Sequence, residues 1–179
     1  MISLRIIDPL IFPLVPADCR AAVNALWQLD EILAKIAVSG REPALRQIRM
    51  RWWCQQVAEL GQGGRTPDEP VLTGLAQHCG AVLHSAAMNA YLAAWEDALA
   101  SADDCGNNEN IDAVARCGRA LFALTHGLIG GMTSTAGQDF DADADGAAGG
   151  AWALAVAAQQ AADGGQAAQA APYWDRAVA

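Results

Sequence analysis

The stretch Arg20–Val38 reads RAAVNALWQLDEILAKIAV and decides the fold class of this chain. Its large apolar residues recur at spacings of three and four, which places them on one face of an α-helix. These residues are Leu26, Leu29, Leu33 and Ile36. Because a helix with one apolar face needs a partner to cover that face, the stretch predicts a helix packed against other helices.

The same pattern continues beyond this stretch. Pro43 suits the first turn of a second helix, which should end in the run GQGG at 61–64. Further helical patterns follow, and no segment alternates as a β-strand would. They cover about 71–83, a segment reaching about 101, 111–129, 151–162 and a short tail ending near 174. The sequence therefore predicts an all-α, single-domain bundle of about six helices over residues 1–179.

Two segments are expected to lie outside the helices. Residues 1–16 contain Pro9, Pro13 and Pro16, which exclude a long helix and favour an extended course across the fold. Residues 130–150 are rich in Gly, Ser, Thr and Asp, so we expect a flexible acidic loop there.

The acidic part of this loop, 139–145, resembles the first half of a calcium-binding loop. Asp141, Asp143 and Asp145 have the required spacing, but the twelfth position holds Trp152 where a bidentate Glu is needed. An acidic surface loop is the favoured interpretation.

Composition and charge narrow the classes of function. The 179-residue chain is 53% hydrophobic and 17% charged, which is enough for one domain with a substantial core. Its net charge of −9 argues against nucleic-acid binding. Residues 1–65 carry eight bases and six acids, whereas residues 66–179 carry three bases and fourteen acids. Any surface that binds anions is therefore expected in the first third of the chain.

The five cysteines stand at scattered spacings and form no zinc-binding pattern. We therefore expect reduced, buried thiols and a cytoplasmic location. No uninterrupted run of about 18 apolar residues occurs, so no membrane span is expected.

The candidate acidic residues are Asp30 and Glu31, in the middle of the first predicted helix. Asp30 has Ala34 one turn later, so this helix offers no pair of carboxylates on one face to share a magnesium ion. Glu31 has Lys35 one turn later, in the favourable order for an ion pair within the helix. Spacing alone thus favours a surface ion pair for Glu31 over a metal site.

Three further segments carry a resemblance to a known family. They are Arg41-Glu42-Pro43, the run IRMRWW at 48–53, and Glu69-Pro70-Val71. Together with the first helix they resemble the squalene/phytoene synthase family. The closest likeness is to its divergent branch of short bacterial proteins and the mitochondrial complex I assembly factor. The resemblance is specific over 20–75 and softer up to about 165.

This resemblance implies the all-α isoprenoid synthase fold. Family enzymes join two prenyl diphosphates, and two facing aspartate-rich helices hold Mg²⁺ against the diphosphates. Catalytic members run to roughly twice a domain of 100–150 residues, so the resemblance implies a shortened version of the fold here.

The family's acidic motifs carry over poorly. The first keeps Asp30 and Glu31, with Asp30 the best candidate for a metal ligand, while its later acidic position falls near Ala34 or Lys35. Where the second motif should lie, within 159–163, only the last residue is acidic. The resemblance therefore implies a protein that has lost the metal-binding motifs of the enzymes. No cofactor is expected, and Mg²⁺ only if the protein is catalytic.

The basic and aromatic residues of the second predicted helix are the candidate substrate-binding residues. Arg49 and Arg51 are two positions apart and point to different helix faces, so one of them could enter a cavity and bind an anion. Trp53 is the third candidate. By their spacing, Trp52, Trp53 and Trp95 are expected to be core anchors.

Two functions follow from the resemblance. The first is a non-catalytic family member that binds an isoprenoid or lipid, or a protein partner during complex assembly. An apolar channel lined by Leu, Ala and Trp would hold the lipid chain. The alternative is an active prenyl transferase in isoprenoid biosynthesis that condenses prenyl diphosphates with an atypical metal site.

Overall fold

All the regular structure in the described part of the chain is helical. The computed structural model describes residues 12–38, 42–102, 107–132, 142–163 and 167–178. Within these ranges it has seven α-helices of nine residues or more, the four-residue α4 and no strand, which confirms the all-α prediction. The helices are α1 (Arg20–Val38), α2 (Pro43–Gly61), α3 (Pro70–His78), α4 (Gly80–Leu83), α5 (Ala86–Ala100), α6 (Asn108–Met132), α7 (Ala142–Asp163) and α8 (Ala167–Ala177).

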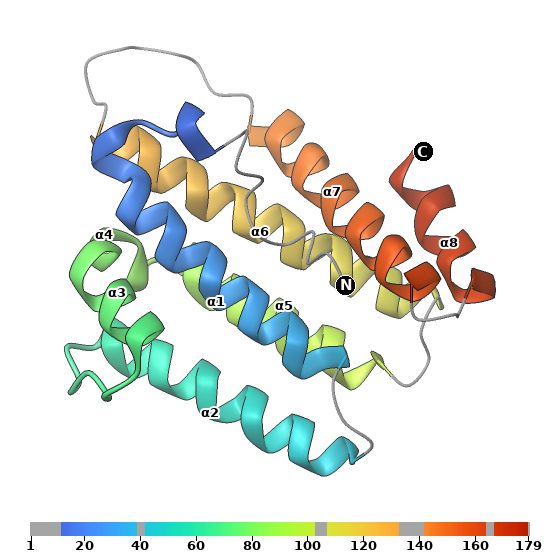
Figure 1. Ribbon diagram of the computed structural model, residues 1–179, viewed down its shortest axis with the longest axis horizontal. Coiled ribbons are helices and arrows are strands. Elements are labelled where there is room, and N and C mark those ends of the chain that lie inside the picture. Colours follow the sequence, from blue (N-terminus) through green and yellow to red (C-terminus); the bar gives the residue numbers. More distant parts are fainter. Residues whose placement is uncertain (1–11, 39–41, 103–106, 133–141, 164–166, 179) are drawn as a thin grey trace.

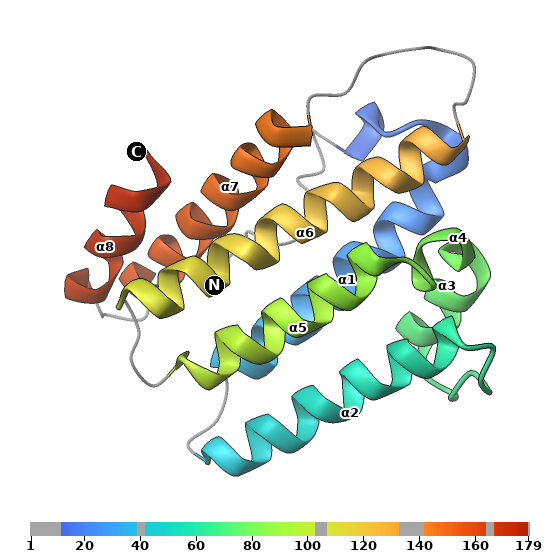
Figure 2. The same cartoon turned by 180° about the vertical axis from the view of Figure 1, so that it is seen from behind.

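The long helix α6 links two groups of helices (Figure 1). On one side it packs against α5 and α1, and on the other it packs against α7. Helix α8 covers α7, and α2 lies along the opposite edge of the molecule, as both ribbon views show (Figure 2).

The larger of two apolar cores lies among α1 to α6. The four residues on the apolar face of α1, from Leu26 to Ile36, are all buried in it, as their spacing predicted. A smaller core joins the start of α6 to α7 and α8, and it is built on Ile111, Leu154 and Tyr173. Helix α6 therefore contributes to both cores.

The predicted loop over 130–150 is wrong at both of its ends. Helix α6 continues to Met132 and α7 begins at Ala142, so Asp143 and Asp145 of the predicted acidic loop belong to α7. Residues 133–141, which include Asp141, lie outside the described residues. Helical structure extends into the predicted loop because α6 and α7 pack closely against each other. A Cβ atom added at Gly118 would lie 2.0 Å from the Gly149 carbonyl oxygen, so only glycine fits there. The small residues that resemble a loop in sequence allow two helices to pack closely.

The N-terminal segment also differs from the extended course predicted for 1–16. Residues 1–11 lie outside the described residues, and Phe12–Leu14 form one turn of 3₁₀-helix. The Arg20 guanidinium donates hydrogen bonds to the carbonyl oxygens of Pro13 and Val15, both at 2.9 Å. These two bonds hold the segment to the start of α1.

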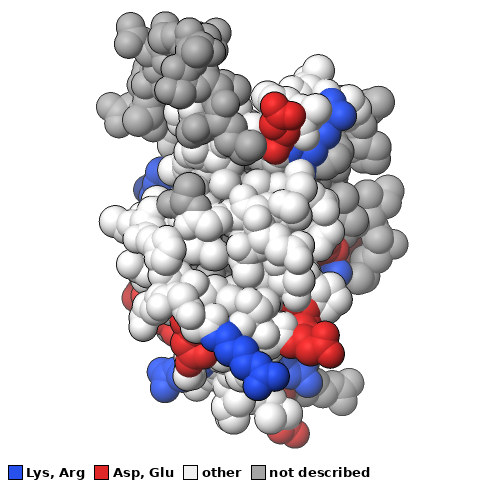
Figure 3. All heavy atoms as spheres, turned by 90° about the vertical axis from the view of Figure 1, so that its left-hand side faces the viewer, with Lys and Arg blue, Asp and Glu red and all other residues white. Residues whose placement is uncertain are grey.

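One end of the molecule carries few charges. From Pro70 to Trp95 the chain contains no Asp, Glu, Lys or Arg. Figure 3 looks at this end and shows a broad uncharged area, with charged side chains gathered below it and a few above. No helix in the described part of the chain is both long enough and apolar enough to cross a membrane.

Four of the five cysteines are buried free thiols, and Cys105 lies outside the described residues. Burial raises the pKa of Cys54 and of Cys79 to about 12. The Cys79 thiol also lies 3.4 Å from the Ala22 carbonyl oxygen. Because the thiolate is the reactive form, these thiols should be inert in the folded protein.

We expect a thiol reagent to distinguish the folded chain from the unfolded one. At pH 8, Ellman's reagent should modify no more than one thiol of the native protein, and all five in guanidinium chloride. The Cys105→Ser variant should leave the native protein unreactive. Rapid modification of that variant without denaturant would contradict the burial described here.

Candidate functional site

The first candidate residue, Asp30, lies on the buried face of α1. Its side chain is only 1% exposed, and its Oδ1 accepts a hydrogen bond of 2.9 Å from the Tyr91 hydroxyl of α5. Asp30 follows Leu26 by four positions and precedes Leu33 by three, so it belongs to the apolar stripe. The best candidate for a metal ligand is therefore buried inside the helix bundle and hydrogen-bonded to Tyr91.

The Tyr91 hydroxyl is buried with this carboxyl. Burial raises the pKa of Tyr91 well above its usual value near 10, and the negative charge of Asp30 raises it further. The indole of Trp95 has the opposite effect on this pKa. Tyr91 is therefore held as a neutral hydrogen-bond donor to Asp30.

The second candidate acid, Glu31, forms the predicted ion pair with Lys35. The Lys35 Nζ lies 2.6 Å from Glu31 Oε1, and the lysine is largely exposed. An ion pair at this helical spacing stabilises a helix by only about 0.2–0.5 kcal/mol. Both acids of the first motif are thus engaged by residues of the chain itself.

The site does not fit the magnesium cluster of the enzymes that the sequence resembles. Among the described residues, no three His, Cys, Asp or Glu side chains come together closely enough to hold a metal ion. The acid of the second motif, Asp163, is exposed at the end of α7 and accepts a hydrogen bond of 2.8 Å from Gln159. Asp30 is buried against α5, so these two acids do not line one cavity.

The three candidate substrate-binding residues stay apart from Asp30. Arg49 and Arg51 are exposed on α2, and within the described ranges neither forms an ion pair or a hydrogen bond through its side chain. Trp53 is partly buried against the larger core. Its ring lies 5.2 Å from that of Trp52, edge to face. Of the two arginines, Arg51 lines a surface hollow between α2 and α5, and neither arginine is brought together with the buried Asp30.

The prediction that three tryptophans are core anchors is confirmed only in part. Trp95 is buried and Trp53 is partly buried, but Trp52 is 43% exposed. Trp52 shares its helix face with Leu45, which is 48% exposed, and Ile48, which is 64% exposed. We call these three residues the α2 ridge.

A groove runs beside the α2 ridge, between α2 and α5. It has a volume of about 530 Å³. Met50 and Leu99 are buried residues of its lining, Ile48 and Arg51 line it from α2, and Glu96 lines it from α5. We call it the α2–α5 groove. The sequence contains a signal for the α2 ridge but not for this groove: α2 has apolar residues on two faces, and the buried residues of the helix lie on only one of them.

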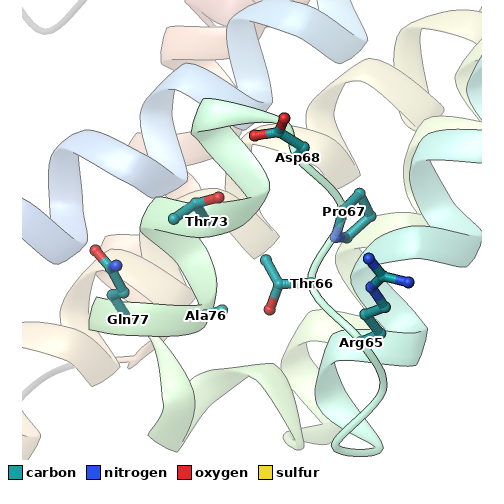
Figure 4. A pocket seen from close by; sticks show the side chains of 7 residues that line it. All are labelled: Arg65, Thr66, Pro67, Asp68, Thr73, Ala76 and Gln77. Atoms are coloured by element: carbon teal, nitrogen blue, oxygen red, sulfur yellow. The ribbon is translucent and has the colours of Figure 1, made fainter.

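A second hollow of about 480 Å³ lies between α3 and the loop that precedes it. Its lining is largely polar, and Figure 4 shows Thr66 between the loop and α3, with Asp68 at one end and Gln77 at the other. Arg65, Asp68 and Gln77 are exposed, so this hollow is an open feature of the surface.

Comparison with known proteins identifies no relative. No protein-family profile, no curated protein and no solved structure matches the chain.

Proposed function

We propose that this chain is a non-catalytic member of the squalene/phytoene synthase family that binds another molecule and does not transform it. Its role would be in protein-complex assembly, or in binding an isoprenoid or lipid, in the reducing setting of the cytoplasm. Four buried free thiols are consistent with that setting.

The observation that carries this proposal is the engagement of Asp30 by Tyr91. A carboxylate that holds magnesium must face its ion with free lone pairs, usually together with other oxygen ligands. Asp30 is 1% exposed and accepts the hydrogen bond of a fully buried hydroxyl. Its neighbour Glu31 is paired with Lys35. Both acids of the residual motif therefore make contacts within the chain, and these contacts stabilise its fold.

The assembly role has more support than the lipid role. The buried leucines of α1 pack with those of α3 and with residues of α5 into one apolar core. The lipid role calls for an apolar channel that holds the lipid chain, whereas the α2–α5 groove and the hollow beside α3 are both open to the surface. A partner that reaches the surface of α2 meets exposed apolar and basic side chains.

A turnover assay tests the proposal. Purified protein incubated with farnesyl or geranylgeranyl diphosphate and Mg²⁺ should release no pyrophosphate above the rate of a protein-free blank. Binding of the prenyl diphosphate without turnover, at concentrations up to millimolar, would support the lipid form of the proposal. Without such binding, the assembly form remains.

The matched variant for this assay is Asp30→Asn, which keeps the shape of the side chain and an oxygen that can accept the Tyr91 hydrogen bond. Magnesium-dependent release of pyrophosphate by the wild type that is lost in folded Asp30→Asn would refute the proposal. It would favour the active prenyl transferase instead.

A further inference from the structure

The exposed face of α2 combines an apolar ridge with unpaired positive charge. At 100° per residue, Leu45, Ile48 and Trp52 share one face of the helix, and Arg49 and Arg51 flank it on opposite sides. From Pro43 to Ala58 this helix contains three arginines and no acid. The third, Arg46, is partly buried and donates a hydrogen bond of 3.1 Å to the Ala37 carbonyl oxygen. The charges left at the surface are therefore those of Arg49 and Arg51.

The α2–α5 groove extends this surface inward. Met50 and Leu99 give it an apolar floor, since both are buried. On the α5 side, Asp97 is already paired with Arg116 at 3.0 Å, which leaves Glu96 as the unpaired acid of the groove. The α2 ridge and the α2–α5 groove together carry two unpaired arginines and one unpaired acid, so the net charge of these unpaired groups is positive.

We propose that the α2 ridge and the α2–α5 groove together bind an amphipathic helix of a partner protein whose apolar face is flanked by acidic residues. An amphipathic helix in a groove is a common mode of recognition, with anchors at i, i+3 or i+4, and i+7. The ridge residues have this spacing on the receiving side. Acidic flanks would pair with Arg49 and Arg51, which gives orientation and faster association.

Two other occupants fit this surface less well. In an antiparallel pair of α2 helices from two copies of the chain, the arginines would meet without an acid on either helix between residues 43 and 58. An anionic membrane would attract Arg49 and Arg51, but it is flat, and the groove is concave with Glu96 on one wall. Both alternatives are outcomes of the test below.

Labelled synthetic peptides test this inference, with fluorescence anisotropy as the readout. One peptide of 18 residues has a leucine face and glutamate flanks, and its partner has lysine in place of every glutamate. The acidic peptide should bind and the basic one should not. Binding of the acidic peptide should weaken by about tenfold or more in Ile48→Ser and in the Arg49→Glu/Arg51→Glu double variant. Added salt should also weaken it.

Two matched variants serve as controls. Leu14→Ser alters an exposed apolar residue away from α2, and Arg65→Glu alters an exposed arginine in the loop before α3. Both should bind the acidic peptide as the wild type does. Helicity and thermal unfolding of every variant should match those of the wild type, because the altered side chains are exposed.

Several results would overturn the inference. Equal binding of both peptides to the wild type would do so. Failure of the acidic peptide to bind the wild type would also do so, and so would acidic-peptide binding that is unchanged in the α2 variants. Binding to phosphatidylserine vesicles that needs Ile48 and the two arginines, without peptide binding, would assign the surface to a membrane. Dimers lost in Ile48→Ser, seen by analytical ultracentrifugation, would assign it to a second copy. The inference rests on the proposed function, but failure of the peptide assay leaves the turnover assay unaffected.

Discussion

Replacing Gly118 with alanine is expected to separate α7 from α6 and to lower the free energy of unfolding by about 3 kcal/mol. The added Cβ would lie 2.0 Å from the Gly149 carbonyl oxygen and 2.6 Å from the Ala153 Cβ. The first of these is a backbone atom, so no rotation of a side chain can relieve the clash. The two helices must move apart, and the smaller core built on Leu154 and Tyr173 would open with them.

Thermal unfolding followed by circular dichroism measures this effect. At roughly 2–4 °C per kcal/mol for a chain of this size, the midpoint should fall by roughly 6–12 °C. Amide hydrogen exchange should show the loss of protection concentrated in α7 and α8. Gly80→Ala is the matched control, since a Cβ there meets no atom within 4 Å. A Gly118→Ala variant as stable as this control would mean that the two helices do not cross as described.

Tyr91→Phe is expected to destabilise the protein by about 1.5–3 kcal/mol, the range for a hydrogen bond to a charged group. The ring stays in place, but the Asp30 carboxyl loses a donor in a site that water does not reach. The double variant Asp30→Leu/Tyr91→Phe removes both partners and should recover part of the loss. Chemical denaturation of the wild type, both single variants and the double variant closes the cycle. Strictly additive effects would show that the two groups do not interact.

The Asp30–Tyr91 contact also predicts how stability depends on pH. The pKa of Tyr91 is higher in the folded than in the unfolded protein, where it is near 10. The unfolded chain therefore loses this proton first, and the contribution of Tyr91 is complete below about pH 10 and falls above it. The free energy of unfolding should decline more steeply from pH 10 to 11 in the wild type than in Tyr91→Phe. The raised pKa values of Cys54 and Cys79 act in the same direction in both proteins and cancel in the comparison.

The bounds of the first two helices could be predicted because their signals are local. The apolar stripe of α1 and the Pro and Gly residues that bound α2 are all within a turn or two of the positions they determine. The start of α7 could not be predicted in this way. Its Asp, Ala and Gly residues have the composition of a loop, and the contact with Gly118 becomes visible only when α6 and α7 are packed.

In the candidate site, too, contacts between residues close in the sequence could be predicted and contacts between distant residues could not. The ion pair of Glu31 with Lys35 follows from their spacing. The partner of Asp30 does not, because Tyr91 is 61 positions away in the sequence. The α2 ridge could be predicted only in part. Its spacing is local, but the sequence alone does not tell which of the two apolar faces of α2 the core covers.

The position of α6 in two cores has a consequence for the order in which the chain folds. Contacts among α6, α7 and α8 join neighbours in the sequence, which costs little loop-closure entropy, so this part should form early. The contacts of α1 with α6 are far more distant in the chain. The Trp27 indole donates to the Thr125 hydroxyl across 98 positions, and Cys19, the residue before α1, contacts the Leu128 carbonyl oxygen across 109. Docking of α1 onto α5 and α6 should therefore be the slow step, and its contact with α5 encloses Asp30 with Tyr91.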